Sequence, residues 1–184
     1  ATNSGAGAVV TKSLGLTARE GYRNPTVVRL PFGFLNALGL PNPGVEAFRA
    51  ELGELRGLGV PVIASIYGFS TEELVEAARR LLGCPIAALE VNLSCPHVGS
   101  IHEAGSDPSV VREMVGGIVE AAAADRKPVF VKLSPNVTDL VPVARAAVEA
   151  GASALTAINT VKAMAIDIEI GGPILSNKVG GLSG

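Results

Sequence analysis

The feature that most constrains the fold is a repeated alternation between short β-branched runs and longer stretches rich in Ala, Leu, Glu and Arg. The runs predict strands at residues 8–12, 61–67, 87–93, 128–133 and 154–159. Their nearly continuous apolar character is typical of strands that are buried on both faces, as in parallel sheets flanked by helices. The alternation therefore predicts an α/β fold, either a (β/α)₈ barrel or a doubly wound sheet.

Start and stop signals define four helices between these strands. A helix over residues 45–57 precedes the second strand. Ser70 and Glu73 form a capping-box pattern that opens a helix ending near residue 82. Asp107 and Pro108 open a helix to about residue 124, and a helix over 139–150 ends before Gly151. No linker or change of composition interrupts the pattern, so residues 1–184 are expected to form a single domain.

Two segments do not follow this alternation. Residues 14–44 form a long excursion with Pro and Gly, which we expect to lack regular structure and to serve function. The glycine-rich end, residues 180–184, is expected to be a loop whose exposed backbone approaches a flat ring or a phosphate. Both are therefore candidates for a binding site.

Composition excludes several classes of protein. With 48% apolar and 17% charged residues, the 184-residue chain must bury a large core and is not disordered. A net charge of −2 argues against nucleic-acid binding. We expect no membrane helix and no signal peptide. Two cysteines do not form a disulfide scaffold, which favours a reducing, cytoplasmic location.

Polar residues gather where the predicted strands end. Lys12 ends the first, Asn92, Ser94 and Cys95 the third, Lys132 the fourth, and Asn159 and Thr160 the fifth. Carboxyl-terminal strand ends build the active site of a βα barrel, whereas a doubly wound sheet uses only the strands at its switch point. Four of five strands end this way, which favours the barrel. The alternative is that the lysines are merely solvated and the asparagines only satisfy loop backbone groups.

The two cysteines have different expected roles. Cys84 precedes a proline beside an apolar strand and is expected to be an inert buried thiol. Cys95 leaves a strand among polar residues and is a candidate base or nucleophile. Zinc binding by Cys95, His97 and His102 is an alternative, but their spacing matches none of the common structural-site patterns. We therefore expect no metal.

Six segments, in order along the chain, together resemble family 1 dihydroorotate dehydrogenases. The central segment is residues 92–96, Asn-Leu-Ser-Cys-Pro, which is similar to the catalytic-loop motif of that family. The other matching segments are residues 11–13, 36–44, 131–135, 158–160 and 177–184. Residues 159–167 are most similar to subfamily 1B.

The resemblance implies an FMN-binding (β/α)₈ barrel that oxidises (S)-dihydroorotate to orotate in pyrimidine biosynthesis. It implies that Cys95 is the catalytic base. The implied contacts with substrate are Lys12, Asn36, Ala37, Leu38, Gly39, Leu40, Asn92, Asn159 and Thr160. The implied contacts with FMN are Lys12, Ser13, Asn92, Lys132, Ile158 and Gly184. Subfamily 1B further implies NAD-linked turnover through a partner subunit carrying FAD and a 2Fe-2S cluster, in a homodimer or heterotetramer.

Departures from the family pattern keep alternatives open. His97 stands where the motif usually has Asn, and Ser65 where subfamily 1B typically has Asn. Five of eight barrel strands are recognisable, so we expect an incomplete barrel, truncated at both ends, that lacks the first strand and the last two. The alternatives are a related FMN barrel that reduces pyrimidines, similar to dihydropyrimidine dehydrogenase, and a non-catalytic relative that only binds flavin or pyrimidine.

Overall fold

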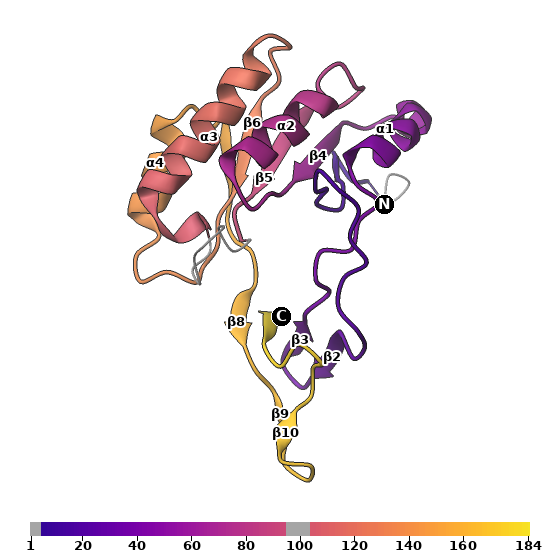
Figure 1. The fold of residues 1–184 in the computed structure, drawn as a ribbon, viewed down its shortest axis with the longest axis vertical. Helices are drawn as coiled ribbons and strands as arrows, with labels where there is room; N and C mark the ends of the chain where they lie inside the picture. The colour runs from indigo at the N-terminus through magenta and orange to yellow at the C-terminus, as the bar shows by residue number, and fades with distance from the viewer. Residues whose placement is uncertain (1–4, 95–103) are drawn as a thin grey trace.

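The computed structural model describes residues 5–94 and 104–184 and contains two main β-sheets and a short two-stranded one (Figure 1). Five parallel strands form the larger sheet in the order β1-β4-β5-β6-β7, which is also their order along the chain. Their bounds are Val9–Val10 (β1), Val62–Ile66 (β4), Ala88–Asn92 (β5), Val129–Lys132 (β6) and Ala154–Thr156 (β7). This confirms the predicted α/β class and all five predicted strands, although β1 and β7 are shorter than expected.

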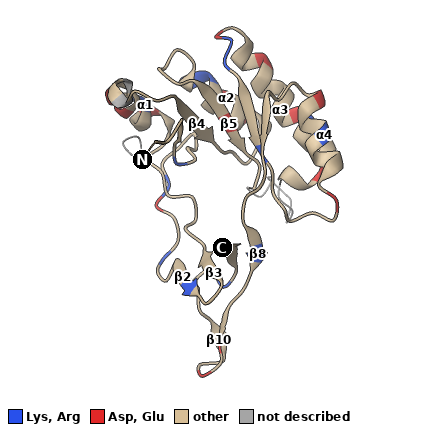
Figure 2. Ribbon diagram, turned by 180° about the vertical axis from the view of Figure 1, so that it is seen from behind, with Lys and Arg blue, Asp and Glu red and all other residues tan. Residues whose placement is uncertain are grey.

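The helices cover one face of the parallel sheet (Figure 1). They are α1 (Val45–Glu54, continued by the 3₁₀ turn Leu55–Leu58), α2 (Thr71–Leu81), α3 (Pro108–Ala123) and α4 (Val141–Glu149). A further 3₁₀ turn, Ala104–Ser106, precedes α3. Neighbouring helices pack against each other in chain order. Most charged side chains lie on these helices and on the connections, not on the strands (Figure 2).

The predicted helix ends are confirmed by their caps. The Ser70 side chain accepts a hydrogen bond from the Glu73 N–H at 3.3 Å, while the Glu73 carboxylate accepts from the Phe69 N–H at 2.8 Å, one residue before the expected partner. Asp107 caps α3 by accepting from the Ser109 N–H at 2.8 Å. Gly151, just beyond α4, has the left-handed φ of 99°.

Strand alternation separates the apolar and polar faces of the parallel sheet. Leu89 and Val91 of β5 point into the core beneath the helices, where they are fully buried. Glu90 and Asn92 alternate with them and face the other side, together with Ser65 of β4. All three of these polar side chains are buried. The face opposite the helices is therefore polar toward the carboxyl ends of the strands.

A four-stranded antiparallel sheet, in the order β2-β3-β11-β8, contradicts two expectations. Its strands are Val27–Leu30, Gly33–Asn36, Gly180–Ser183 and Val161–Ala163, in that order. The excursion over residues 14–44 thus contains the β2–β3 hairpin, and the glycine-rich end is a strand, not a loop. Gly181 pairs with both Asn36 and Lys162, so its place in a sheet depends on distant partners.

The antiparallel sheet extends away from the helices and ends in a short hairpin (Figure 1). That hairpin consists of β9 (Ile166–Asp167) and β10 (Gly172–Pro173). Leu35, Ala37 and Leu175 form a small second core beneath the sheet. Within the described residues, none of the helices combines the length and apolar character that a membrane crossing requires.

Candidate active site at the strand ends

The side chain of Asn92, the last residue of β5, is the centre of a hydrogen-bond network. Its Oδ1 accepts from the Ser94 hydroxyl at 2.6 Å, from the Ser94 N–H at 3.2 Å and from Asn159 Nδ2 at 3.2 Å. Its Nδ2 donates to Ser13 Oγ at 3.3 Å. One amide therefore joins the chain after β1, the end of β5 and the chain after β7.

The network continues in both directions from Asn92. Ser13 Oγ lies 3.0 Å from Ser65 Oγ, which brings in the end of β4. Asn159 Nδ2 also donates to Ser94 Oγ, and Asn159 Oδ1 accepts from the Thr160 N–H at 2.9 Å. Because parallel strands place their carboxyl ends at the same edge, residues far apart in sequence meet here.

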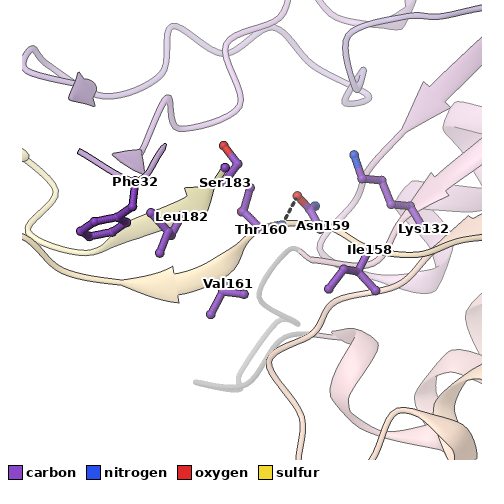
Figure 3. A pocket seen from close by; sticks show the side chains of 9 residues that line it. Phe32, Lys132, Ile158, Asn159, Thr160, Val161, Leu182 and Ser183 are labelled. Carbon is purple, nitrogen blue, oxygen red and sulfur yellow. Dashed lines mark hydrogen bonds between the residues drawn. The ribbon is translucent and has the colours of Figure 1, made fainter. Parts of the chain in front are cut away.

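A pocket of about 400 Å³ opens beside this network (Figure 3). Its residues come from both sheets, with Lys132, Asn159 and Thr160 on one side and Phe32 and Leu182 on the other. The full lining is Phe32, Lys132, Ile158, Asn159, Thr160, Val161, Leu182, Ser183 and Gly184. The pocket is therefore completed by the antiparallel sheet.

The lining divides into a polar and an apolar part. Lys132 supplies an ammonium group, and Asn159 and Thr160 supply hydrogen-bonding side chains. Val161 and Ile158 are about half exposed, Phe32 is more exposed still, and all three supply apolar surface. Within the described chain, no carboxylate lies within 4.0 Å of the Lys132 ammonium. This combination suits a flat ligand with a polar, electron-rich edge.

Glycines allow the antiparallel sheet to approach the strand ends. A Cβ atom on Gly181 would lie 1.9 Å from Thr160 Oγ1. One on Gly180 would lie 2.5 Å from the carbonyl oxygen of Asn36. The Asn36 side chain in turn donates to the Gly181 carbonyl at 3.2 Å. Any side chain at these positions would push β11 away from Thr160 and β3.

The segment over residues 38–40 presents its amides and ties its carbonyls to the protein. The Leu38 carbonyl accepts from the Tyr22 N–H at 3.0 Å and the Gly39 carbonyl from Arg19 Nε at 2.7 Å. The Leu40 carbonyl accepts from Asn42 Nδ2 at 2.9 Å. Among the residues that the structure describes, none accepts from the N–H groups of residues 38–40. These N–H groups remain available to a ligand, and successive backbone N–H groups in a turn are one means by which proteins bind anions.

The structure brings half of the predicted site residues together. Ser13, Asn92, Asn159 and Thr160 belong to the network, and Lys132, Ile158, Asn159, Thr160 and Gly184 line the pocket. Lys12 lies beyond the end of β1 and is exposed, and residues 36–40 lie outside the pocket lining. Cys95, His97 and His102 lie outside the described residues. The predicted role of Cys95 as base and the zinc alternative therefore concern residues outside this part of the chain.

Several site residues are additional to those predicted. Ser65, a departure from the subfamily pattern, has a buried hydroxyl that lies against the Ser13 hydroxyl. Ser94, at the end of a predicted strand, forms hydrogen bonds with both Asn92 and Asn159. The other additions line the pocket: Phe32, Val161, Leu182 and Ser183. Leu182 and Ser183 belong to the glycine-rich motif, but no sequence signal pointed to Phe32.

Comparison with known proteins places this site in a family. The family model described as dihydroorotate dehydrogenase matches residues 1–184. The chain is 52% identical over 181 residues to the dihydroorotate dehydrogenase B (NAD(+)) catalytic subunit of Methanocella arvoryzae, covering 98% of this chain and 58% of that protein. Proteins of the same name from Pyrococcus horikoshii and Methanocaldococcus jannaschii are 52% and 46% identical, over 100% and 98% of this chain and 59% of each relative. The chain thus spans less than two thirds of the length of these relatives.

Proposed function

Because the chain belongs to the dihydroorotate dehydrogenase family, we propose that the protein oxidises (S)-dihydroorotate to orotate with the aid of FMN. The observation that carries this proposal is the junction of the Asn92 network with the pocket around Lys132. It supplies amide groups, a cation and an apolar surface in one place. We infer further that the five parallel strands belong to a (β/α)₈ barrel, as the order β1-β4-β5-β6-β7 allows.

The pocket fits the isoalloxazine ring of FMN. Ile158, Val161 and Leu182 would lie against its apolar part, and Lys132 would meet its polar pyrimidine edge. The predicted contacts Ser13, Asn92 and Gly184 belong to the network or the lining. When bound, FMN accepts the hydride that leaves the substrate, and the charge of Lys132 stabilises the negative charge that develops at that edge.

The asparagines are suited to holding a dihydropyrimidine ring. The edge of that ring alternates carbonyl and N–H groups, and an Asn side chain supplies both an acceptor and donors. Asn92 and Asn159 are already oriented by each other and by Ser94. Their preorganisation reduces the conformational entropy lost on binding. These contacts would hold the reacting carbons in one orientation.

The carboxylate of the substrate is assigned to the free amides of residues 38–40, together with Lys12 and Asn36. Charge-assisted hydrogen bonds from amides and ammonium groups are the interactions that a carboxylate requires.

Cys95, one residue beyond Ser94, is assigned as the base that removes the proton from the carbon beside the ring carbonyl. As a thiolate it would accept that proton while the hydride leaves the adjacent carbon.

We also propose that an electron-transfer subunit with FAD and a 2Fe-2S cluster connects this reaction to NAD⁺. The names of the relatives, which contain "NAD(+)" and "catalytic subunit", support this proposal. The test is anaerobic reduction of the protein's flavin by dihydroorotate, followed by reoxidation with NAD⁺ in the presence and absence of the partner. We expect reduction by dihydroorotate, and reoxidation by NAD⁺ only with the partner.

Titration of the flavin absorbance with orotate and uracil separates this proposal from a pyrimidine-reducing enzyme. Uracil lacks the carboxylate, so orotate should bind at least 10-fold more tightly, the loss expected for one charge-assisted hydrogen bond. Equal affinities, with flavin reduction by dihydrouracil, would favour the pyrimidine-reducing alternative. Binding of either ligand without any flavin reduction would favour a non-catalytic protein.

A further inference from the structure

The buried side chain of Asn42 uses all of its hydrogen-bonding capacity. Its Oδ1 accepts from the Gly15 N–H at 3.1 Å and from the Gly44 N–H at 2.9 Å. Its Nδ2 donates to the Leu40 carbonyl and to the Tyr67 hydroxyl, both at 2.9 Å. A buried amide with four partners is fixed in orientation, because any rotation would leave polar groups unsatisfied.

The partners of Asn42 connect residues 40–44 to two strand ends of the parallel sheet. Gly15 follows β1, and its N–H is one of the two donors to Asn42 Oδ1. Tyr67 follows β4, is 3% exposed, and meets the Phe69 ring edge-on at 5.9 Å. A Cβ on Gly15 would lie 2.7 Å from the Tyr67 ring, so this anchor is closely packed. Asn42 therefore attaches the segment to a rigid part of the fold.

Leu40 needs such an anchor because of its backbone conformation. Its φ is +58°, in the left-handed region that residues with a Cβ adopt only at a cost in energy. The bond from Asn42 Nδ2 to its carbonyl is the side-chain contact that holds it there. Rotation of Leu40 out of this region would redirect its N–H and change the row of free amides over residues 38–40.

We propose that Asn42 is a positioning residue, which keeps Leu40 left-handed and thereby directs the amides of residues 38–40 toward the carboxylate of the ligand. This inference rests on the proposed function, which assigns the substrate carboxylate to those amides. Asn42 itself touches neither ligand in this scheme. Its contribution is selectivity for a carboxylated pyrimidine over one without the carboxylate.

Two substitutions of Asn42 remove the amide N–H group that donates to Leu40 and keep an acceptor, the hydroxyl of the shorter Ser side chain lying away from the position of that amide nitrogen. Asn42→Asp retains oxygens for the Gly15 and Gly44 N–H groups but has no N–H for the Leu40 carbonyl. Asn42→Ser is the uncharged counterpart, with a hydroxyl that can still accept from Gly44. The matched control is Tyr67→Phe, which removes one partner of Asn42 and leaves its bond to Leu40 in place.

The experiment titrates flavin absorbance of the full-length, flavin-loaded protein with orotate and with uracil, and records flavin content and melting temperature. We expect each Asn42 variant to lose about 10-fold in orotate affinity while uracil affinity changes by less than about twofold. Tyr67→Phe should lose less than about threefold for orotate. The ratio of orotate to uracil affinity is a readout that a general loss of stability would not move.

The possible outcomes separate this inference from the proposed function. If the unaltered protein does not prefer orotate, the proposed function itself fails. If it prefers orotate and a folded Asn42 variant keeps that preference, only the positioning role of Asn42 is overturned. A loss of flavin and a large drop in melting temperature in both Asn42 variants would show that the residue serves the fold alone, and would also overturn the proposal.

Discussion

The amide of Asn92 shows how a single side chain organises this site. It is 8% exposed and makes hydrogen bonds to Ser13, Ser94 and Asn159. An Asn side chain can do this because it carries an acceptor and a donor on one planar group. Its neighbour in the chain, Ser94, directly precedes Cys95. The residue proposed as the base thus follows a segment that the network already holds in place.

Replacing Cys95 with Ala is expected to leave flavin content unchanged and to lower the rate of flavin reduction by dihydroorotate by about 10²–10⁴-fold. That range is the usual contribution of a general base, and Ala has no group to accept the proton. The measurement is anaerobic stopped-flow reduction of the bound flavin. Cys84→Ala is the matched control, since Cys84 is only partly buried, not buried as expected, and packs against the helix-covered core, where it should not affect the rate. A Cys95→Ala protein with an unaltered rate would refute the assignment.

At the scale of elements, strand β11 can lie close to its neighbours because two of its residues have no side chain. It runs between β3 and β8, and Gly180 and Gly181 allow it to lie against Asn36 and Thr160. Thr160 lines the pocket, and so do Leu182 and Ser183 of β11 itself. The packing of one glycine-rich strand therefore decides the shape of the binding site.

Gly181→Ala is expected to lower both flavin retention and melting temperature. The new Cβ would lie 1.9 Å from Thr160 Oγ1, so that Thr160 or the strand must move; such overpacking typically costs about 1–3 kcal/mol. Gly172→Ala is the control, because a Cβ there meets nothing within 4 Å. Flavin fluorescence after gel filtration and a thermal melt measure the two effects. Equal behaviour of the two variants would show that close approach at Gly181 is unimportant.

The cap of helix α3 makes stability depend on pH. Hydrogen bonds from the side chain and backbone of Ser109 hold the pKa of the Asp107 carboxyl below its ordinary value. A lowered pKa in the folded state adds stability above the unfolded pKa of about 3.9, and this is lost as pH falls through the folded pKa. Asp107→Ala should therefore cost about 1 kcal/mol at pH 7, the usual value of an N-cap, and less below about pH 4.

Urea unfolding of the full-length protein at several pH values checks this expectation. Ser109→Ala is the comparison, since it removes the side-chain donor and keeps the Ser109 backbone donor. Ser109→Ala should reduce the pH-dependent stabilisation by the Asp107 cap without abolishing it. A difference between wild type and Asp107→Ala that stays constant from pH 7 to pH 3 would contradict the role of the carboxylate.

At the scale of the whole molecule, the parallel sheet has two strands with a single neighbour each. In the described chain, β1 pairs only with β4 and β7 only with β6. Val10 of β1 is 48% exposed, and Leu155 of β7 is 37% exposed. Such edges expose both apolar surface and unpaired backbone groups, which further strands of a closed barrel would cover.

Residues 1–184 expressed alone are therefore expected neither to retain FMN nor to melt cooperatively. The comparison is with the full-length protein, purified in the same way, using flavin absorbance, size-exclusion chromatography and calorimetry. The open edges should also lead to association of the fragment. A yellow, monomeric fragment with one cooperative transition would show that the five-stranded sheet is sufficient by itself.

Local signals in the sequence determined the α/β layer of this protein. Apolar runs predicted the five parallel strands, and Ser70, Asp107 and Gly151 marked helix ends that the structure confirms. These succeed because a cap or a period of apolar residues acts within a few positions along the chain. Polar residues at the predicted strand ends likewise include Asn92, Lys132 and Asn159, which lie in the network or the pocket lining. They meet there because parallel strands have their carboxyl ends at one edge.

The antiparallel sheet and the second wall of the pocket were decided only by the tertiary structure. Asn36 and Gly181 are 145 residues apart, and nothing near either one specifies their contact. The glycine-rich sequence of residues 180–184 predicts a loop because glycine has a low intrinsic preference for strands. It becomes a strand because β3 and β8 supply its partners and because only glycine fits against Thr160. Contacts of this kind depend on the whole fold, and so does the place of Phe32 in the pocket.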